Sequence, residues 1–468
     1  MHLKLNEIQQ QYPPAPSGQL LPEIRKLLVK SDKTIVVLDD DPTGTQTVYD
    51  VPVLTEWSAD VIAKEFSLKT PLFYVLTNSR SLPKKEAESL ANTIGNNIKE
   101  AYRQTGRNFV IISRSDSTLR GHYPDEVDAL LHTLEKEQAI RIIVPAFFEG
   151  GRFTIGDIHY VQEGDHLVSA AETPFAEDKS FGYQHADLKQ WIEEKTAGRV
   201  KAKNVYSFGI NSLRTQSTEE ISTALKNLAP ASTCIVNALA PFDLQHFVLA
   251  LIESEVDVLC RTAASFVAAM GGLAPQPLLT ATEISDNQKS GGLTVVGSYV
   301  PKSTTQLEYL LSSGLVQAVE LSVDDIIATS DKSLLIDMFA EQINTFLGSS
   351  QDVVLYTSRK LVSGENQEES LSIGKQVSNA LTEIVKKLTV KPRYLIAKGG
   401  ITSSDIATQA LDVKKAMVLG QLMPGIPVWK LGSECKYPDM RYIIFPGNVG
   451  NEKALVDMVK KLERRENG

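Results

Sequence analysis

Three consecutive aspartates follow an apolar run, in the sequence LDDDPTGTQT at residues 38–47. Carboxylates this close repel one another, which raises the pKa of each, unless a cation or the hydroxyl groups of a polyol share the site. We therefore predict that Asp40 and Asp41 bind substrate hydroxyl groups and that one of them serves as a general base. The alternative is an acidic turn, in which an aspartate caps the next element and Pro-Thr-Gly forms the turn.

A second group of charged and hydroxyl side chains lies in SRSDSTLRGHYPDE at residues 113–126. Two guanidinium groups beside hydroxyls and a carboxylate suit a small anionic polyol, because Arg binds a carboxylate through two parallel hydrogen bonds and Asp accepts from hydroxyls. The residues that we predict to bind substrate here are Arg114, Asp116, Ser117 and Arg120. Asp116 is also a third candidate base. The alternative is an internal Arg–Asp pair, with Ser and Thr as helix caps.

Two further segments combine an arginine with small polar residues. TNSRSLP (77–83) contains Arg80, and FFEGGRFTIGDIHYV (147–161) contains Arg152 and His159. We include these three residues in the predicted substrate site. For His159 the alternative is a histidine whose ring nitrogens are satisfied within the fold.

Glycines follow three predicted strands of the second half, in VVGSYVPKSTTQ (295–306), IAKGGITSSDIATQAL (396–411) and FPGNVGNEKAL (445–455). Glycine lets backbone N–H groups approach an anion at the start of a helix. The predicted phosphate-binding residues are Gly297, Ser298, Gly399, Gly400, Ile401, Thr402, Gly447, Asn448 and Gly450. Ordinary turns with a Ser or Thr cap are the alternative. The first segment is not a P-loop, because Lys302 stands where the second glycine would be. Zincin, serine-hydrolase and classical dinucleotide-binding signatures are absent.

The elements that position these residues are short β-branched runs that alternate with amphipathic stretches. This alternation predicts parallel sheets with helices on both faces. The predicted strands are 34–39, 72–78, 108–114, 141–147 and 233–238, then 293–298, 317–323, 352–358, 393–400 and 442–447. Helices are predicted at 84–105, at 124–137 and around 243–270, and loops or an inserted flap at 150–200. Most candidate residues stand at strand ends, where open α/β sheets bind ligands.

The length of 468 residues favours two domains. Composition shifts to Gly, Pro and polar residues at 270–292, where we place the linker. We predict an arm at 1–30, a first domain at 31–275, a linker at 276–292 and a second domain at 293–468. The predicted fold class is α/β, with two three-layer domains, mostly parallel sheets and the active site in the interdomain cleft.

Charge and cysteine content restrict the partners. The net charge of −9 argues against a general nucleic-acid or anionic-membrane binder, and no apolar run is long enough to span a membrane. Cys234, Cys260 and Cys435 are far apart in the sequence, which favours a reducing cytosol. We expect a cytoplasmic protein with small-molecule ligands and no nucleic-acid or membrane partner. The sequence leaves a homodimer open.

The motifs together resemble the four-carbon acid sugar kinase family. They are DDPTGTQ (40–46), SRSDSTLRGH (113–122), PAFFEGGRFTIGDIHYV (145–161), KGGITSSD (398–405) and PGNVG (446–450), and they occur in the family's order. The resemblance implies an N-terminal acid-sugar-binding domain and a C-terminal nucleotide-binding domain. It also implies ATP-dependent phosphorylation of a hydroxyl of a threonate, an erythronate or a 3-oxo-tetronate, with ATP and Mg²⁺ as cofactors.

Two other functions are compatible with these residues. One is a non-catalytic sugar-acid sensor that keeps the pocket without turnover. The other is a metal-dependent hydrolase or aldolase that uses the acidic cluster, for which the sequence identifies no metal ligands. Only the kinase requires ATP.

Overall fold

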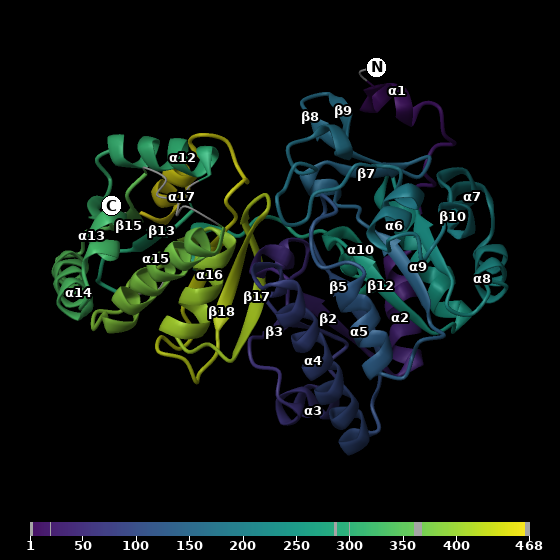
Figure 1. Cartoon of the computed structure of the whole chain (residues 1–468), viewed down its shortest axis with the longest axis horizontal. Helices are drawn as coiled ribbons and strands as arrows, with labels where there is room; N and C mark the ends of the chain where they lie inside the picture. The colour runs from purple at the N-terminus through teal and green to yellow at the C-terminus, as the bar shows by residue number, and fades with distance from the viewer. Residues whose placement is uncertain (1–2, 19, 285–287, 299, 360–366, 464–468) are drawn as a thin grey trace. The chain divides into compact units, whose positions relative to one another are not determined.

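The computed structural model divides into two compact units (Figure 1). Unit 1 consists of Met1–Val48 and Glu56–Pro275, and unit 2 of Tyr49–Thr55 and Gln276–Gly468. Each contains a mostly parallel sheet with flanking helices, so the predicted two-domain α/β fold is confirmed. The sequence did not predict that 49–55 would join unit 2. The residues that the structure describes are 3–18, 20–284, 288–298, 300–359 and 367–463.

The main sheet of unit 1 is parallel, and it contains every strand predicted for the first half. These strands are apolar and almost continuously buried, as is typical of strands covered on both faces. In order across the sheet they are β10 (Tyr206–Phe208), β11 (Thr233–Val236), β6 (Ile140–Val144), β12 (Val258–Thr262), β5 (Asn108–Arg114), β2 (Lys33–Asp39) and β4 (Leu72–Leu76).

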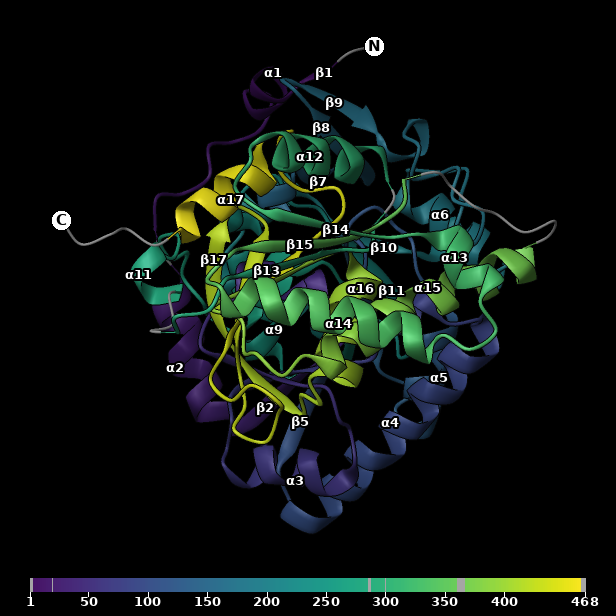
Figure 2. The ribbon, with the colours of Figure 1, turned by 90° about the vertical axis from the view of Figure 1, so that its left-hand side faces the viewer.

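Helices lie on both sides of strands β2 and β5 (Figure 2). Helix α4 has the predicted bounds, whereas α5 is shorter than predicted. One side carries α3 (Ala59–Ser67), α4 (Lys84–Thr105) and α5 (Asp125–Thr133), and the other carries α2 (Leu21–Ser31) and α9 (Pro241–Ser254). The remaining helices of unit 1 are α1 (Leu5–Gln9), α6 (Leu188–Lys195), α7 (Ile210–Thr215), α8 (Thr218–Lys226) and α10 (Ala264–Met270).

Strand β12 corrects the prediction of helices throughout 243–270. The sequence VLCRT forms a strand between α9 and α10, and all five residues are buried. A short apolar run cannot be assigned to strand or helix from periodicity alone, and here pairing with β5 and β6 decides for the strand.

The segment 150–200 is also more regular than predicted. It contains three antiparallel strands, β7 (Arg152–Ile155), β8 (Ile158–Glu163) and β9 (His166–Ser169), and then α6. The N-terminal arm extends this small sheet, because β1 (Leu3–Lys4) pairs with β9. Ile8 of the arm packs in an apolar cluster with Phe153 and Ile155 of β7. The arm therefore supports the strand that carries Arg152.

The sheet of unit 2 is mixed. Its parallel part contains every strand predicted for the second half, and its antiparallel part was not predicted. In order the strands are β3 (Val51–Leu54), β17 (Lys415–Met423), β18 (Ile426–Leu431), β19 (Arg441–Phe445), β16 (Leu395–Lys398), β13 (Leu293–Val296), β15 (Val353–Thr357) and β14 (Gln317–Leu321).

Helices flank this sheet as well (Figures 1 and 2). One group packs around α17, and the other packs around the long helix α15. The first group is α11 (Ala281–Ile284), α12 (Pro301–Ser312) and α17 (Ala454–Leu462); the second is α13 (Val323–Ala328), α14 (Ser333–Gly348), α15 (Gln367–Lys387) and α16 (Gly400–Asp405), which continues as a π-helix at Ile406–Ala410. None of the helices in the described residues has the length and apolar character needed to cross a membrane.

Candidate functional site

Backbone hydrogen bonds join the turns that follow β2, β4 and β5. The amide of Asp40 donates to the carbonyl of Arg114 at 3.3 Å. The amide of Thr77 donates to the carbonyl of Asp39 at 2.8 Å. The strands are adjacent and parallel, so their polar ends meet at one edge of the sheet. The residues gathered there are Asp39, Asp40, Asp41, Arg80, Arg114, Asp116 and Arg120, which we call the charge cluster.

Arginine–aspartate pairs dominate this cluster. Arg80 binds Asp40 through two hydrogen bonds, with Nη2–Oδ1 at 2.6 Å and Nε–Oδ2 at 3.2 Å. Arg114 Nη1 lies 3.0 Å from Asp39 Oδ1. Arg120 Nε lies 2.8 Å from Asp116 Oδ2. These arginines therefore form the internal Arg–Asp pairs that were the alternative interpretation of the motif.

Asp41 caps the short 3-10 helix Pro42–Thr47. Its Oδ1 accepts hydrogen bonds from the amide of Thr43 at 2.8 Å and from the hydroxyl of Thr43 at 2.5 Å. Asp41 Oδ1 thus acts as a helix cap, which was the alternative interpretation of the aspartate run. The other oxygen, Oδ2, lies 3.6 Å from Arg80 Nη1.

Exposure separates the aspartates into two pairs. The side chains of Asp41 and Asp116 are 19% and 13% exposed, whereas those of Asp40 and Asp39 are 4% and 1% exposed. Both oxygens of Asp40 are already engaged, because Ser115 donates its hydroxyl to Oδ2 and Arg80 binds both atoms. Asp41 and Asp116 are the carboxylates of this cluster that a ligand can reach most directly.

Burial and the arginines have opposite effects on the aspartate pKa values. Burial raises the pKa of Asp39 to about 7, because Arg114 offsets only part of the desolvation. Burial acts on Asp40 in the same direction, but Arg80 outweighs it and lowers the pKa. The pKa of Asp116 lies well below its ordinary value, because its burial is outweighed by Arg120 and Arg80. Asp40 and Asp116 are therefore ionised at neutral pH.

Arg152 differs from the arginines of the charge cluster because it forms no ion pair within the described part of the chain. Its Nη1 donates to the carbonyl of Gly150, and its Nε is buried without a partner. The guanidinium lies 5.8 Å from the ring centroid of Phe175, and Arg120 lies 5.0 Å from the same centroid. An arginine without a carboxylate partner is suited to bind a substrate carboxylate.

His159 is fully buried and holds the loop that carries Ser117. Its Nε2 lies 2.7 Å from the carbonyl of Ser117, and its Nδ1 lies 3.0 Å from the hydroxyl of Thr154. Burial lowers the pKa of His159 to about 4, so the ring is neutral at pH 7. Both ring nitrogens have partners within the fold, which was the alternative for this residue, and Ser117 itself is half-buried beside Asp116.

Sequence reasoning missed three residues around Asp40. Ser115 donates to its carboxylate, and the buried Arg261 of β12 donates to the carbonyl of Arg120 at 3.2 Å. Glu126 of α5 is nearly buried, which raises its pKa to about 7. Arg261 was missed because β12 was not predicted. The sequence feature that could have identified Arg261 is the position of an arginine near the end of an apolar run.

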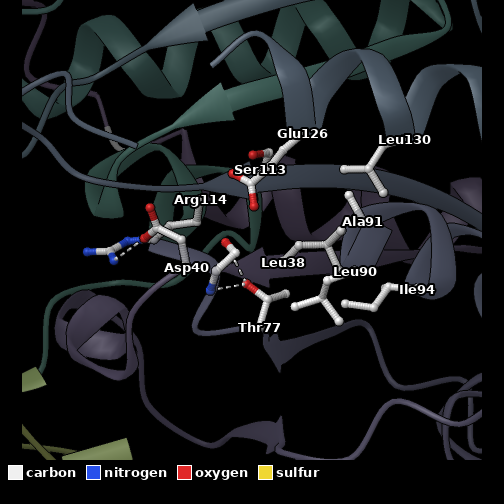
Figure 3. Close-up of a pocket in the computed structure, with 11 residues that line it drawn as sticks. Leu38, Asp40, Thr77, Leu90, Ala91, Ile94, Ser113, Arg114, Glu126 and Leu130 are labelled. Carbon is white, nitrogen blue, oxygen red and sulfur yellow. Dashed lines mark hydrogen bonds and ion pairs between the residues drawn. The ribbon is translucent and has the colours of Figure 1, made fainter. Parts of the chain in front are cut away.

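A cavity of about 10 Å³ lies next to Asp40, between the sheet and helices α4 and α5 (Figure 3). Its polar lining includes Thr77, Ser113 and Glu126, and its apolar lining includes Ile94 of α4. This is about the volume that one water molecule requires. The cavity is therefore too small for a ligand larger than a water molecule.

In unit 2, the turns after β13, β16 and β19 meet around Ser298. Gly399 has φ +116°, which side chains rarely adopt, and a Cβ there would lie 3.1 Å from Ser298 Cβ. A Cβ on Gly447 would lie 3.1 Å from Ser298 Oγ. At Gly297, a Cβ would lie 2.3 Å from Thr402 Oγ1. A side chain at any of these positions would press on Ser298 or Thr402, so the three turns are closely packed against one another.

The remaining predicted phosphate-binding residues border the same turns. Gly400 and Ile401 begin α16, and Ile401 is 58% exposed although its side chain is apolar. Asn448 is exposed, and Gly450 has φ +82°. We call Gly297–Ser298, Gly399–Thr402 and Gly447–Gly450 the glycine turns.

Three cations surround the glycine turns, and the sequence analysis did not assign them to the site. Lys302 Nζ donates to the carbonyl of Asn448 at 3.2 Å, and Arg359 Nη2 donates to the carbonyl of Ser298 at 2.6 Å. Lys398, the last residue of β16, is completely buried. The sequence feature that could have identified Lys398 is the position of a basic residue directly before Gly-Gly. Within the described residues, no group of three or more His, Cys, Asp or Glu side chains is arranged to hold a metal ion.

The fold and the two sites define a two-domain α/β protein that binds small polar ligands. Comparison with protein families matches residues 35–270 to a sugar-binding N-terminal domain and residues 293–455 to a nucleotide-binding C-terminal domain. The chain belongs to the four-carbon acid sugar kinase family, in which these two domains occur together.

Solved structures share the fold at low sequence identity. A Haemophilus influenzae protein of the DUF1537 family is 18% identical, with a TM-score of 0.61 over 91% of this chain and 99% of that one. A Salmonella typhimurium LT2 protein, provisionally described as a tRNA synthase, is 15% identical, with a TM-score of 0.66 over 92% of this chain and 99% of that one. A comparison with curated proteins found no match.

Proposed function

We propose that the chain is an ATP-dependent kinase that phosphorylates a hydroxyl group of a four-carbon acid sugar of the threonate, erythronate or 3-oxo-tetronate type. The observation that carries this proposal is the charge cluster, which presents ionisable carboxylates and guanidinium groups together at one sheet edge of a sugar-binding domain. A nucleotide-binding domain in the same chain supports phosphoryl transfer. Among the described residues, unit 1 supplies the acidic cluster and unit 2 supplies the glycine turns with their neighbouring cations.

The acid sugar requires a cation for its carboxylate and acceptors for its hydroxyls. Arg152 is the cation that we assign to the carboxylate, because it has no internal ion pair among the described residues. Arg120 lies on the same aromatic ring and adds positive charge. Asp116 and Ser117, which are partly exposed, are assigned to the hydroxyl groups.

Asp41 is the general base that we assign. Its Oδ2 has one weak contact, to Arg80 at 3.6 Å, and can accept the proton of the attacking hydroxyl. Asp116 is the competing base, but its arginine partners hold its pKa well below the ordinary range, which makes it a poor proton acceptor. Asp40 then serves to fix Arg80 beside Asp41.

The glycine turns of unit 2 are assigned to the phosphates. Their backbone N–H groups and the neighbouring cations fit a polyphosphate, and ATP supplies the phosphoryl group when bound. We propose that Mg²⁺ accompanies the nucleotide, as it does in most phosphoryl transfers. The predicted cofactors thus remain ATP and Mg²⁺.

The test is ADP release in a coupled assay with MgATP and a panel of four-carbon acids. We expect turnover with at least one threonate, erythronate or 3-oxo-tetronate stereoisomer. Butyrate is the matched control, because it keeps the carboxylate and the four carbons but offers no hydroxyl. Acid binding without ADP release would favour the sensor, and acid breakdown without ATP would favour the hydrolase or aldolase.

A further inference from the structure

Lys398 is an unusually isolated buried cation. Its side chain is 0% exposed, and its Nζ lies 3.2 Å from the carbonyl of Pro446 and 3.7 Å from the ring centroid of Phe445. Within the described residues it forms no ion pair. One carbonyl and one aromatic face only partly replace the water that a charged ammonium loses on burial.

The charged groups that act on Lys398 from neighbouring elements are cations as well. They are Lys302 of α12 and Arg359, which follows β15. Two further nitrogens of Arg359, Nε and Nη1, are buried and have no hydrogen-bond partner among the residues that the structure describes. Burial first, and then repulsion from these two cations, lowers the pKa of Lys398 to about 7. Among the described residues, no carboxylate acts on Lys398 itself, whereas Glu308 and Glu320 act on Arg359.

We propose that Lys398 is the counter-charge of the nucleotide phosphates and that it takes up a proton when they bind to the glycine turns. This inference rests on the proposed function. The phosphates attract a positive charge strongly where water is excluded, which favours the ammonium over the amine. The proton comes from solvent and bonds to the Nζ lone pair, and no other bond changes. Lys398 acts as a positioning residue, because its charge holds the phosphates without requiring exposure of its side chain.

Calorimetry of ATP binding to the full chain tests this coupling. Binding is measured at pH 8 in buffers with different ionisation enthalpies, because the phosphates of free ATP are then almost fully ionised. We expect uptake of roughly one proton per bound nucleotide. In Lys398→Met the uptake should disappear and ATP should bind roughly tenfold to hundredfold more weakly. Adenosine, which has no phosphate, should bind both proteins equally.

A second variant keeps the inference testable if Lys398→Met does not fold. Lys302 is exposed, so Lys302→Met should fold, and it removes one of the repelling cations. The pH at which proton uptake reaches half its maximum should then move upward. If ATP binds without proton uptake, or if Lys302→Met leaves the pH profile of the uptake unchanged, the role of Lys398 is overturned and the proposed function is not. Failure of ATP to bind overturns the proposed function as well.

Discussion

The arginines of the charge cluster in unit 1 are paired with carboxylates, whereas Lys398 beside the glycine turns of unit 2 has no ion pair among the described residues. In the charge cluster, Arg80 and Asp40 share two hydrogen bonds, and Arg120 binds Asp116. Beside the glycine turns, Lys398 has a carbonyl and a ring, and no ion pair among the described residues. Each arginine of the charge cluster thus has a carboxylate partner within the fold. Lys398 has none among the described residues.

This difference matches the two kinds of ligand. A polyol is mostly neutral, so its hydroxyls need fixed acceptors and donors whose positions are set in advance. A polyphosphate carries several negative charges, so cations left without partners gain most from it. The comparison predicts opposite responses to mutation in the two units.

The largest expected effect is on catalysis. Asp41→Asn keeps the shape of the side chain but cannot accept a proton, so kcat should fall by about 10²–10⁴. Binding of the acid should change much less, because an amide still hydrogen-bonds a hydroxyl. The measurements are kcat and substrate Kd, with Asp116→Asn in parallel. If Asp116→Asn loses turnover selectively and Asp41→Asn does not, the base is Asp116.

The second prediction concerns stability without ligand. Asp40→Asn leaves the Arg80 guanidinium without its main anion, which should lower the free energy of unfolding by roughly 3 kcal/mol. Lys398→Met replaces an uncompensated buried charge with an apolar chain and should leave stability unchanged or raise it. Urea unfolding of both variants measures the difference. Equal destabilisation by both would remove the distinction between paired and unpaired charge.

The third prediction tests the unpaired arginine of unit 1. Arg152→Ala should raise the KM for the acid by roughly tenfold to hundredfold, because a hydrogen bond between charged groups is lost. The KM for ATP should not change. Arg199→Ala is the matched control, since Arg199 is an exposed arginine already paired with Asp128. An unchanged KM in Arg152→Ala would assign the substrate carboxylate to another group.

The fourth prediction concerns the glycine turns. Gly399→Ala places a Cβ at φ +116° and 3.1 Å from Ser298, so ATP affinity should fall by about tenfold through displacement of the turn. Gly348→Ala is the control within the same unit, because nothing lies within 4 Å of its added Cβ and its φ is ordinary. Comparable ATP affinities in the two variants would exclude this turn from the nucleotide site.

The fifth prediction concerns the pH dependence of stability. The folded-state pKa of Lys398 is lowered from 10.5 to about 7, so its contribution to stability is lost as the pH falls from about 10 to 7. The pKa of Asp39 is raised from 3.8 to about 7. The contribution of Asp39 to stability is therefore lost as the pH rises from about 4 to 7. Fluorescence of Trp429 reports on unit 2. The slope between pH 7 and 9 should be smaller in Lys398→Met.

The parallel strands could be predicted from sequence because apolar runs such as TIVV are buried on both faces. The antiparallel pair β17–β18 was missed, although every second residue of β17 is buried. That alternation is visible in KAMVLGQLM, but glycine inside a strand weakens the pattern. The strand β12 was missed because a run of only three apolar residues, VLC, fits a helix equally well.

The members of the candidate site could be predicted better than their pairing. The polar residues after β2, β4 and β5 were found because strand ends in α/β sheets bind ligands. The sequence could not show that Arg80 binds Asp40 rather than a substrate, because that depends on side-chain geometry across two turns. Lys398 was overlooked because a lysine at a strand end usually reaches solvent.

The contact of β1 with β9 has a consequence for the order of folding. Leu3 pairs with Leu167, so this contact closes a very long loop, whereas β7, β8 and β9 are neighbours in sequence. Closing a long loop costs more chain entropy than forming adjacent hairpins, and such contacts form slowly. The hairpins that carry Arg152 and His159 should therefore form first, and the arm should dock onto them afterwards. The arm is synthesised before these hairpins, yet we expect it to reach its place after them.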